Sequence, residues 1–204
     1  MRSAILLLPA ILALSTQASD APYPYEGHAE RPVAPMQLHG TCPGECCSYG
    51  DWRTTGTTTL HAEARDAARL LARVPAGTEL VALGGFVHLT RVGAARSMRE
   101  VSLGWNDKTA AHSMLPAHVQ VSVLDHLGEG FWRVWHAGEI HQLPVDDSAA
   151  DAVGQDSDPQ RGLVFEHRPV STWWAQVRLP RADQAGWINM DEAPLITGAD
   201  GCAD

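Results

Sequence analysis

The second half of the chain carries short runs in which hydrophobic and polar residues alternate, a pattern typical of half-buried β-strands. In HVQVSVLDHL, residues 118–127, Val119, Val121 and Val123 alternate with polar side chains. FWRVWHAGEIHQL, residues 131–143, predicts two short strands around a turn at 137–139. Several short strands separated by turn residues predict an all-β sandwich or small barrel.

A further pair of strands is predicted near the C-terminal end. The two faces of TWWAQVRL, residues 172–179, carry Trp173, Ala175, Val177 and Leu179 on one side and Trp174, Gln176 and Arg178 on the other. PRADQAGWI then turns and returns in a strand that ends at Ile188. We expect Trp187 of this strand to lie in the core.

The pattern changes character between residues 54 and 83. A Thr-rich start favours a strand, and Pro75-Ala76-Gly77 predicts a turn before the apolar TELVAL. Between them, HAEARDAARLLARV spaces its small and apolar residues by three and four positions, so an amphipathic helix also fits this piece. DDSAADAVGQDSDPQ, residues 146–160, has five Asp and no basic residue, and is predicted to be an acidic surface loop.

The N-terminus has the layout of a secretory signal peptide. Arg2 precedes the apolar stretch Ala4–Leu14, and small residues follow up to Ala18. The apolar stretch is well short of the roughly 20 residues that span a bilayer, so we expect a cleaved signal at 1–18 and no membrane span. Residues 19–50, rich in Pro, Gly and Cys, are predicted to form an extended arm.

Composition narrows the choice of partner. The net charge is −9, Lys108 is the sole lysine, and no cluster of arginines stands out along the sequence. A strongly acidic chain without a basic stripe repels negatively charged phosphates, so we expect neither nucleic acid nor anionic lipid as a partner. Seven Trp against three Phe and three Tyr is an unusual excess, which fits either core packing or ligand contact.

Three of the four cysteines lie in CPGECC, residues 42–47. In an exported chain, an even number of cysteines predicts disulfides, whereas the same spacing in a cytosolic chain would suggest a metal site. A Cys46–Cys47 bridge between neighbours is strained. We favour Cys42–Cys47 with Cys46–Cys202 over Cys42–Cys46 with Cys47–Cys202. Either long-range bridge would constrain the unfolded chain by several kcal/mol in the loop-entropy description.

Two segments resemble a bacterial SH3-like (SH3b) domain. LHAEARDAARLLARVPAGTELVAL resembles its first half, in which a loop and a small-residue strand lead to a "G-T-x-V" strand. WWAQVRLPRADQAGWI resembles its second half, in which a Trp-led strand meets a polar turn and a "G-W-V/I" strand. This resemblance implies that Leu60 and Leu70–Val74 are strand residues flanking a loop, and it therefore disfavours the helix.

The resemblance covers Thr54–Leu83 and Thr172–Leu195, with a long insertion between them. Part of the insertion, HVQVSVL and GFWRVW, itself resembles the strands on either side of the distal loop of such a domain, although EIHQL departs from the "G-W-V" pattern. We therefore expect an all-β, disulfide-stapled fold at 51–198, with a small SH3-like barrel as one elaborated copy or two degenerate copies. In the elaborated copy an inserted hairpin and the acidic loop 146–160 interrupt the barrel. Residues 199–204 form a tail with Cys202.

The tryptophans are the strongest candidates for ligand binding. Trp132, Trp135 and Trp174 lie on or next to predicted strand faces, and rings that point away from the core suit stacking on sugars or gripping a peptide. The alternative is that they pack beneath the arm or the inserted loop. His136 and His141, with Glu139 between them, bracket the predicted turn and are the candidate metal pair. Two solvated hairpin histidines explain the pattern better, because no third ligand is identifiable.

No motif predicts catalysis. The cysteines lie in a Pro/Gly-rich knot or in the last three residues, which leaves no separate fold for a cysteine nucleophile and its histidine. G-x-S-x-G is absent. We therefore expect a periplasmic or extracellular, non-enzymatic binding module without a cofactor. The resemblance implies peptidoglycan or an envelope protein as its partner. The alternative is an envelope hydrolase or metal-dependent enzyme that uses His136 and His141.

Overall fold

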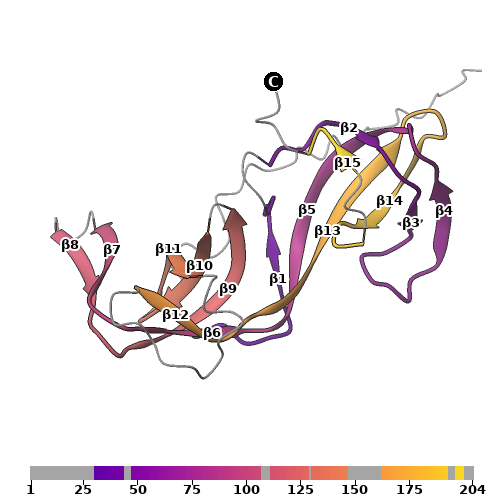
Figure 1. The fold of residues 1–204 in the computed structure, drawn as a ribbon. Helices are drawn as coiled ribbons and strands as arrows, with labels where there is room; N and C mark the ends of the chain where they lie inside the picture. The colour runs from indigo at the N-terminus through magenta and orange to yellow at the C-terminus, as the bar shows by residue number, and fades with distance from the viewer. Residues whose placement is uncertain are drawn as a thin grey trace, which may run out of the picture.

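The described part of the chain is entirely β-structure. The computed structural model describes residues 30–43, 47–106, 111–128, 130–146, 162–192 and 196–199, and these form fifteen strands joined by turns and loops. The predicted signal peptide, Cys46, Cys202 and the body of the acidic loop lie outside these residues. The strands divide into a curled sheet, a closed barrel and a hairpin (Figure 1).

The curled sheet has the strand order β15-β2-β5-β13-β14-β3-β4, with β1 on the free part of β5. Its strands are β1 (Met36–His39), β2 (Asp51–Thr54), β3 (Thr58–His61), β4 (Leu70–Val74), β5 (Glu79–Arg91), β13 (Val170–Leu179), β14 (Gln184–Asn189) and β15 (Ile196–Thr197). All its pairings are antiparallel. Part of the segment expected to be an extended arm therefore forms a strand, since β1 pairs with β5.

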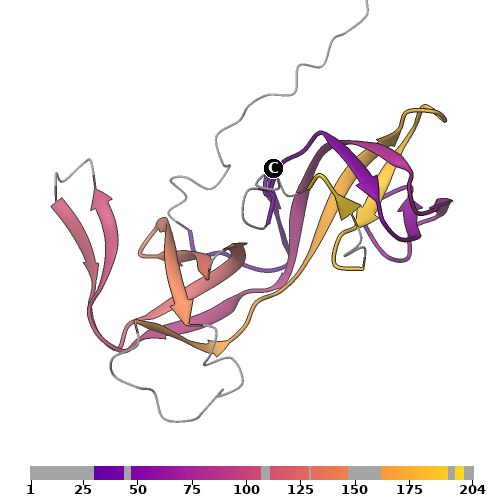
Figure 2. The ribbon, with the colours of Figure 1, turned by 45° about the horizontal axis from the view of Figure 1, so that its top comes forward.

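The barrel closes through five strands in the order β10-β11-β12-β6-β9. They are β6 (Gly93–Ser97), β9 (Gln120–Gly128), β10 (Phe131–His136), β11 (Glu139–Asp146) and β12 (Leu163–His167). Only β11 and β12 pair in parallel among them. The hairpin β7 (Val101–Asn106) and β8 (Ala111–Leu115) projects beyond the barrel, at the end of the molecule opposite the curled sheet (Figure 2).

The helix considered for HAEARDAARLLARV does not form. Thr58–His61 and Leu70–Val74 are antiparallel strands, with Leu60 opposite Ala72, and the alanines at helical spacing lie in the loop between them. The strand assignment of Leu60 and Leu70–Val74 is confirmed. Leu60 and Val74 are fully buried in the sheet's core, because tertiary packing outweighs the weak helical propensity of so short a segment.

The two main bodies have separate cores. The concave face of the curled sheet buries a cluster that includes Trp52, Leu80, Val177 and Ile188. The barrel interior is filled by a second cluster drawn from all five barrel strands: Ala95, Val121, Val123, Trp132, Val134, Leu143, Val145, Leu163 and Phe165, with Leu115 of the hairpin. Val121 and Val123, whose alternation with polar residues predicted a strand, both belong to this core.

A third, smaller cluster joins the sheet to the barrel. Leu38 of β1 and Val87 and Leu89 of β5 pack against Leu124 of β9. The register of β9 on β10 shifts between Val123 and Asp125, so that Leu124 is the extra residue of a bulge. Val121 and Val123 point into the barrel, so alternation directs Leu124 outward toward β1 and β5, and the bulge then brings Asp125 to the outer side as well. Ser122 lies on the same outer face of β9 and is also buried.

Candidate binding surfaces

The three tryptophans expected to bind ligand do not form one surface. Trp132 and Trp135 lie on β10, three positions apart and therefore on opposite faces, and Trp174 lies on β13 in the other body. Trp132 is 7 % exposed and Trp174 is 2 % exposed, while Trp135 is half-buried. Trp132 and Trp174 are therefore not exposed to solvent as expected, and their burial agrees with the alternative that these rings are packed.

Trp132 is buried because it points into the barrel. Its ring lies 4.8 Å from that of His126 and 4.9 Å from that of Phe165, measured between centroids, and the Arg168 guanidinium lies over it at 5.8 Å. Barrel diameter grows with strand number, and a barrel of about eight strands is already just filled by side chains, so a five-stranded barrel leaves no free interior. The large indole thus fills the end of the core, and is not available for stacking on a ligand.

Trp174 does lie on the convex face of the curled sheet, as the alternation predicted, but that part of the face is covered. The His61 ring packs against it at 5.7 Å and perpendicular to it. Asn189, directly opposite Trp174, donates a hydrogen bond of 3.1 Å from Nδ2 to Asp66 Oδ1 in the β3–β4 loop. This bond ties the β3–β4 loop to the residue beside Trp174 on the same face.

The histidine pair is brought together at the β10–β11 turn. His136 lies opposite Glu139 and His141 lies opposite Val134, so all three ionisable residues share one face. His141 Nε2 is 3.9 Å from Glu139 Oε2. Burial lowers the pKa of His141, and the neighbouring His136 lowers it further, although Glu139 and a hydrogen bond with the Leu103 backbone oppose this. Among the described residues, no three of His, Cys, Asp and Glu gather closely enough to hold a metal ion.

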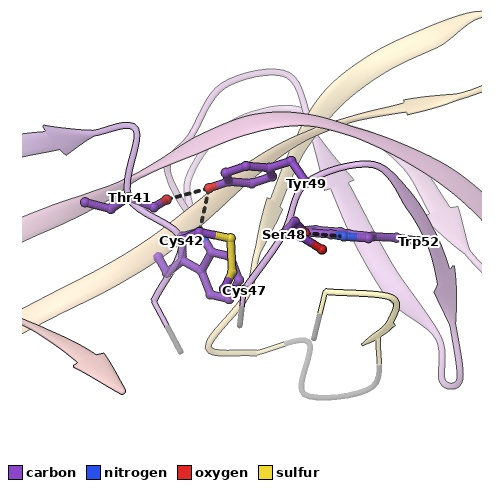
Figure 3. The surroundings of a disulfide bond; sticks show 7 residues. Thr41, Cys42, Cys47, Ser48, Tyr49 and Trp52 are labelled. Carbon is purple, nitrogen blue, oxygen red and sulfur yellow. Dashed lines mark hydrogen bonds between the residues drawn. A yellow bond between two sulfur atoms is a disulfide. The ribbon is translucent and has the colours of Figure 1, made fainter. Parts of the chain in front are cut away.

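The disulfide Cys42–Cys47 forms, as predicted, and its surroundings tie the N-terminal segment to the curled sheet (Figure 3). The Tyr49 hydroxyl donates a hydrogen bond of 2.5 Å to the Thr41 carbonyl, and Trp52 Nε1 donates one of 2.9 Å to the Ser48 carbonyl. Burial raises the pKa of Tyr49, which keeps this hydroxyl a donor. The Cys46–Cys202 bridge lies outside the described residues and stays a prediction.

Trp187 is the aromatic residue that the sequence interpretation misplaced. Gly186 and Ile188 on either side of it face the concave core, so Trp187 must face outward. Its ring packs edge-on against Phe86 at 5.3 Å, and it stays half-buried. The alternation in QAGWIN contained this signal. Ile188, not Trp187, takes the core position.

The surroundings of Trp187 combine rings with hydrogen-bonding groups. We call the convex-face residues His39, Gly84, Phe86, Gln176 and Trp187 the aromatic face. Gln176 lies between Trp187 and Gly84 across three neighbouring strands, and the His39 ring lies 5.4 Å from that of Phe86. No atom lies within 4 Å of where a Cβ at Gly84 would sit, so there is open space beside Gln176. This arrangement offers a ring for stacking and an amide for hydrogen bonding.

One buried ion pair lies on the outer wall of the barrel. Arg133 Nε is 3.5 Å from Asp125 Oδ1, and the two side chains are 7 % and 2 % exposed. Neither carboxylate oxygen of Asp125 has a hydrogen-bond partner in the described structure. Burial raises the pKa of Asp125 to about 6 despite the attraction of Arg133. Desolvation outweighs the ion pair, whose contact of 3.5 Å from Arg133 Nε to Asp125 Oδ1 is longer than a good hydrogen bond.

Comparison with known proteins identifies no relative of this chain. The chain matches no protein-family model, and neither a curated protein nor a solved structure proves similar to it. As to membranes, none of the residues that the structure describes belongs to a helix long and apolar enough to cross one.

Proposed function

We propose that this protein is an exported, non-enzymatic binding module of the cell envelope that contacts its target through the aromatic face. Peptidoglycan is the target we favour, because sugar rings stack on tryptophan and hydrogen bond to amide side chains. An envelope protein is the alternative target. The single observation that carries the proposal is Trp187, half-buried on the convex face beside Gln176 and the open position at Gly84.

Two features support export. The first 18 residues have the composition of a secretory signal. Cys42 and Cys47 form a disulfide, and such bonds persist in oxidising compartments and are rare in the cytosol. A periplasmic or extracellular location accounts for both features together.

The finer fold assignment is also a proposal, namely one SH3-like copy interrupted by an insertion. This assignment is supported because the two segments that resemble an SH3-like domain contribute strands to the same sheet. Strands β3, β4 and β5 come from the first segment and β13 and β14 from the second, and β13 pairs with β5 while β14 pairs with β3. The inserted hairpin of β10 and β11 lies within the intervening residues, which close into the barrel with a core of its own.

Retention on purified cell-wall sacculi tests the proposal. We expect the mature protein to co-sediment with sacculi and the Trp187→Ala variant to be lost to the supernatant. Phe131→Ala is the matched control, because Phe131 is an aromatic residue, 42 % exposed, on the barrel. If the mature protein is not retained, peptidoglycan is not its target. If both variants are retained equally, the aromatic face does not bind the sacculi.

The envelope-protein target is tested separately by co-purification from a detergent-treated envelope fraction. A protein retained by the mature chain and by Phe131→Ala, but lost with Trp187→Ala, supports it. The rival interpretation as a metal-dependent hydrolase is addressed by elemental analysis of the purified protein. A stoichiometric metal that disappears in His141→Ala would favour the rival over a binding module.

A further inference from the structure

A groove opens at the rim of the curled sheet, away from the aromatic face. Two turns form its walls: Pro75–Thr78 between β4 and β5, and Leu179–Ala182 between β13 and β14. Arg53 of β2 and Arg73 of β4 complete the lining, with Arg181 on the second turn. Its volume of about 340 Å³ lies within the range of small-ligand and peptide sites. We call it the arginine groove.

The groove concentrates positive charge in a chain of net charge −9. Three of its lining residues are arginines, and Glu79 is the one carboxylate among them. Glu79 lies directly opposite Arg53 in the β2–β5 pair, yet no ion pair joins them in the described structure. The chain does pair its arginines elsewhere, with Glu63, Glu166 and Asp125 as partners.

None of the three guanidinium groups of the groove takes part in an ion pair or a side-chain hydrogen bond with another described residue. Guanidinium groups present planar forks of donors that match the two oxygens of a carboxylate. Three such forks, from two strands and one turn, line one hollow without a partner among the described residues, and are arranged to receive acidic groups.

The first wall of the groove is held rigidly in place. Thr54, 1 % exposed, donates a hydrogen bond of 2.7 Å from Oγ1 to the Pro75 carbonyl and accepts one of 2.9 Å from the Thr78 amide. The Gly77 amide donates to the Thr54 carbonyl at 2.7 Å, and Gly77 adopts a φ of 79°, which favours glycine. A wall fixed before binding lowers the entropy cost of association.

The floor and second wall are partly apolar. Val74 is 1 % exposed at the base of the groove, and Pro75, Leu179 and Pro180 line it. The second turn is closed by a hydrogen bond of 3.2 Å from the Ala182 amide to the Leu179 carbonyl, and it carries Arg181 at its tip. An apolar floor beneath a cationic rim suits a ligand with both acidic groups and hydrocarbon side chains. A peptide has both, whereas inorganic phosphate has only the charge.

We propose that the arginine groove binds an acidic peptide segment of a partner protein, with Arg53, Arg73 and Arg181 receiving its carboxylates. Hydrocarbon side chains of the peptide lie against Val74, Leu179 and the two prolines. This site is separate from the aromatic face and does not depend on the function proposed for it. The net negative charge of the chain opposes the approach of an acidic peptide, but this repulsion is screened beyond about 8 Å at physiological salt.

Fluorescence anisotropy with a labelled peptide of alternating glutamate and leucine tests the assignment on the full mature protein. We expect Arg73→Gln and Arg181→Gln each to weaken binding by about tenfold, which corresponds to about 1.4 kcal/mol, because each variant loses a charged hydrogen-bond donor for the peptide carboxylates. Glu79→Gln should strengthen binding, because it removes the one repelling carboxylate.

Arg178→Gln is the matched control. Arg178 is an exposed arginine on β13, one residue before Leu179, and does not line the groove. It should leave the affinity within about twofold, and circular dichroism confirms that each variant folds. Failure of the peptide to bind overturns the proposal. So does an equal loss with Arg178→Gln, which would reveal attraction to net charge alone.

Two competitors separate a peptide site from a general anion site. The same peptide with glutamine in place of glutamate should not compete, because it lacks the carboxylates. Inorganic phosphate should compete only at concentrations at least about a hundredfold higher than the acidic peptide. Equal competition by phosphate or by the glutamine peptide would show that the groove does not recognise acidic peptides as such.

Discussion

The main-chain amide of Ser48 donates a hydrogen bond of 2.9 Å to the carbonyl oxygen of Ala199, which joins the disulfide segment to the end of the described chain. Cys47 precedes Ser48, and Cys202 follows Ala199 by three residues. We therefore expect Cys46 and Cys202 to form the second disulfide. Peptide mapping under non-reducing conditions should recover a Cys46–Cys202 cross-link beside Cys42–Cys47. A free thiol at both remaining cysteines would contradict it.

Gly85 is predicted to be intolerant of any side chain. A Cβ at this position would overlap the Tyr49 hydroxyl and lie 2.6 Å from the Trp174 carbonyl oxygen. Gly85→Ala should lower the free energy of unfolding by about 2–4 kcal/mol, because the obstructing carbonyl belongs to a paired strand and cannot move aside. Urea unfolding measures the loss. Gly162→Ala is the control, since its Cβ would meet nothing closer than 3.7 Å, and it should change stability little.

Asp125 should make folding less favourable as the pH rises. Burial raises its pKa to about 6 in the folded protein, from an ordinary value near 3.8. The folded state therefore binds more protons than the unfolded state between these values, and stability contributed at acidic pH is lost as the pH rises toward neutrality. Asp125→Asn removes this dependence. The stability of the variant relative to the wild type should rise by roughly 2–3 kcal/mol between pH 4 and pH 7.

Urea unfolding of both proteins at several pH values isolates this effect, because other titrating groups cancel in the difference. At pH 4 Asp125 is mostly protonated in the folded wild-type protein, so Arg133 lacks a charged partner in both proteins, and the ion pair that the variant loses is part of the pH-dependent difference. A difference in stability that is constant from pH 4 to pH 7 would contradict the raised pKa of Asp125.

His141 should titrate below the ordinary histidine range. Its pKa is lowered chiefly by burial, while the Glu139 carboxylate raises it. The NMR resonance that disappears in His141→Gln should therefore have a midpoint below 6.5, and Glu139→Gln should move this midpoint lower still. A midpoint that rises in Glu139→Gln would contradict the placement of the two side chains on one face.

The lowered pKa of His141 also has a consequence for stability. Because the folded protein binds the proton less readily than the unfolded chain, this residue favours folding above pH 6.5 and its contribution is lost as the pH falls through that value. His141→Gln should show a smaller loss of stability than the wild type between pH 7.5 and pH 5.5 in thermal unfolding.

The local elements follow from the sequence because strand periodicity and turn residues are local signals. The alternation around Val121 and Val123 placed both side chains inside, and Ala137-Gly138 formed the turn between β10 and β11, with φ values of 50° and 93°. The resemblance to a small barrel correctly favoured strands over a helix at Leu70–Val74. The strain of a bridge between neighbours left two pairings for Cys42, with Cys46 or with Cys47, and the structure shows the favoured Cys42–Cys47 bond.

Burial of residues on the convex face of the curled sheet did not follow from the sequence. Alternation placed Trp174 and Trp173 on opposite faces, and this was right, but it could not show that the His61 ring packs against Trp174 or that Asp66 bonds to the neighbouring Asn189. Trp132 shows the related difficulty in the barrel. A periodicity of two separates the faces of a strand and says nothing about which face a closed barrel will enclose.

The arginine groove was invisible along the chain because its three arginines are 20 and 108 positions apart. By itself, the sequence determined the β-class and the positions of several strands and turns, and it favoured the local disulfide over one other pairing; all of these depend on neighbouring residues. Only the tertiary structure decided which rings reach solvent and which charges meet. Those outcomes depend on strand pairing between distant segments, such as β5 with β13, and on the loops that cover the resulting faces.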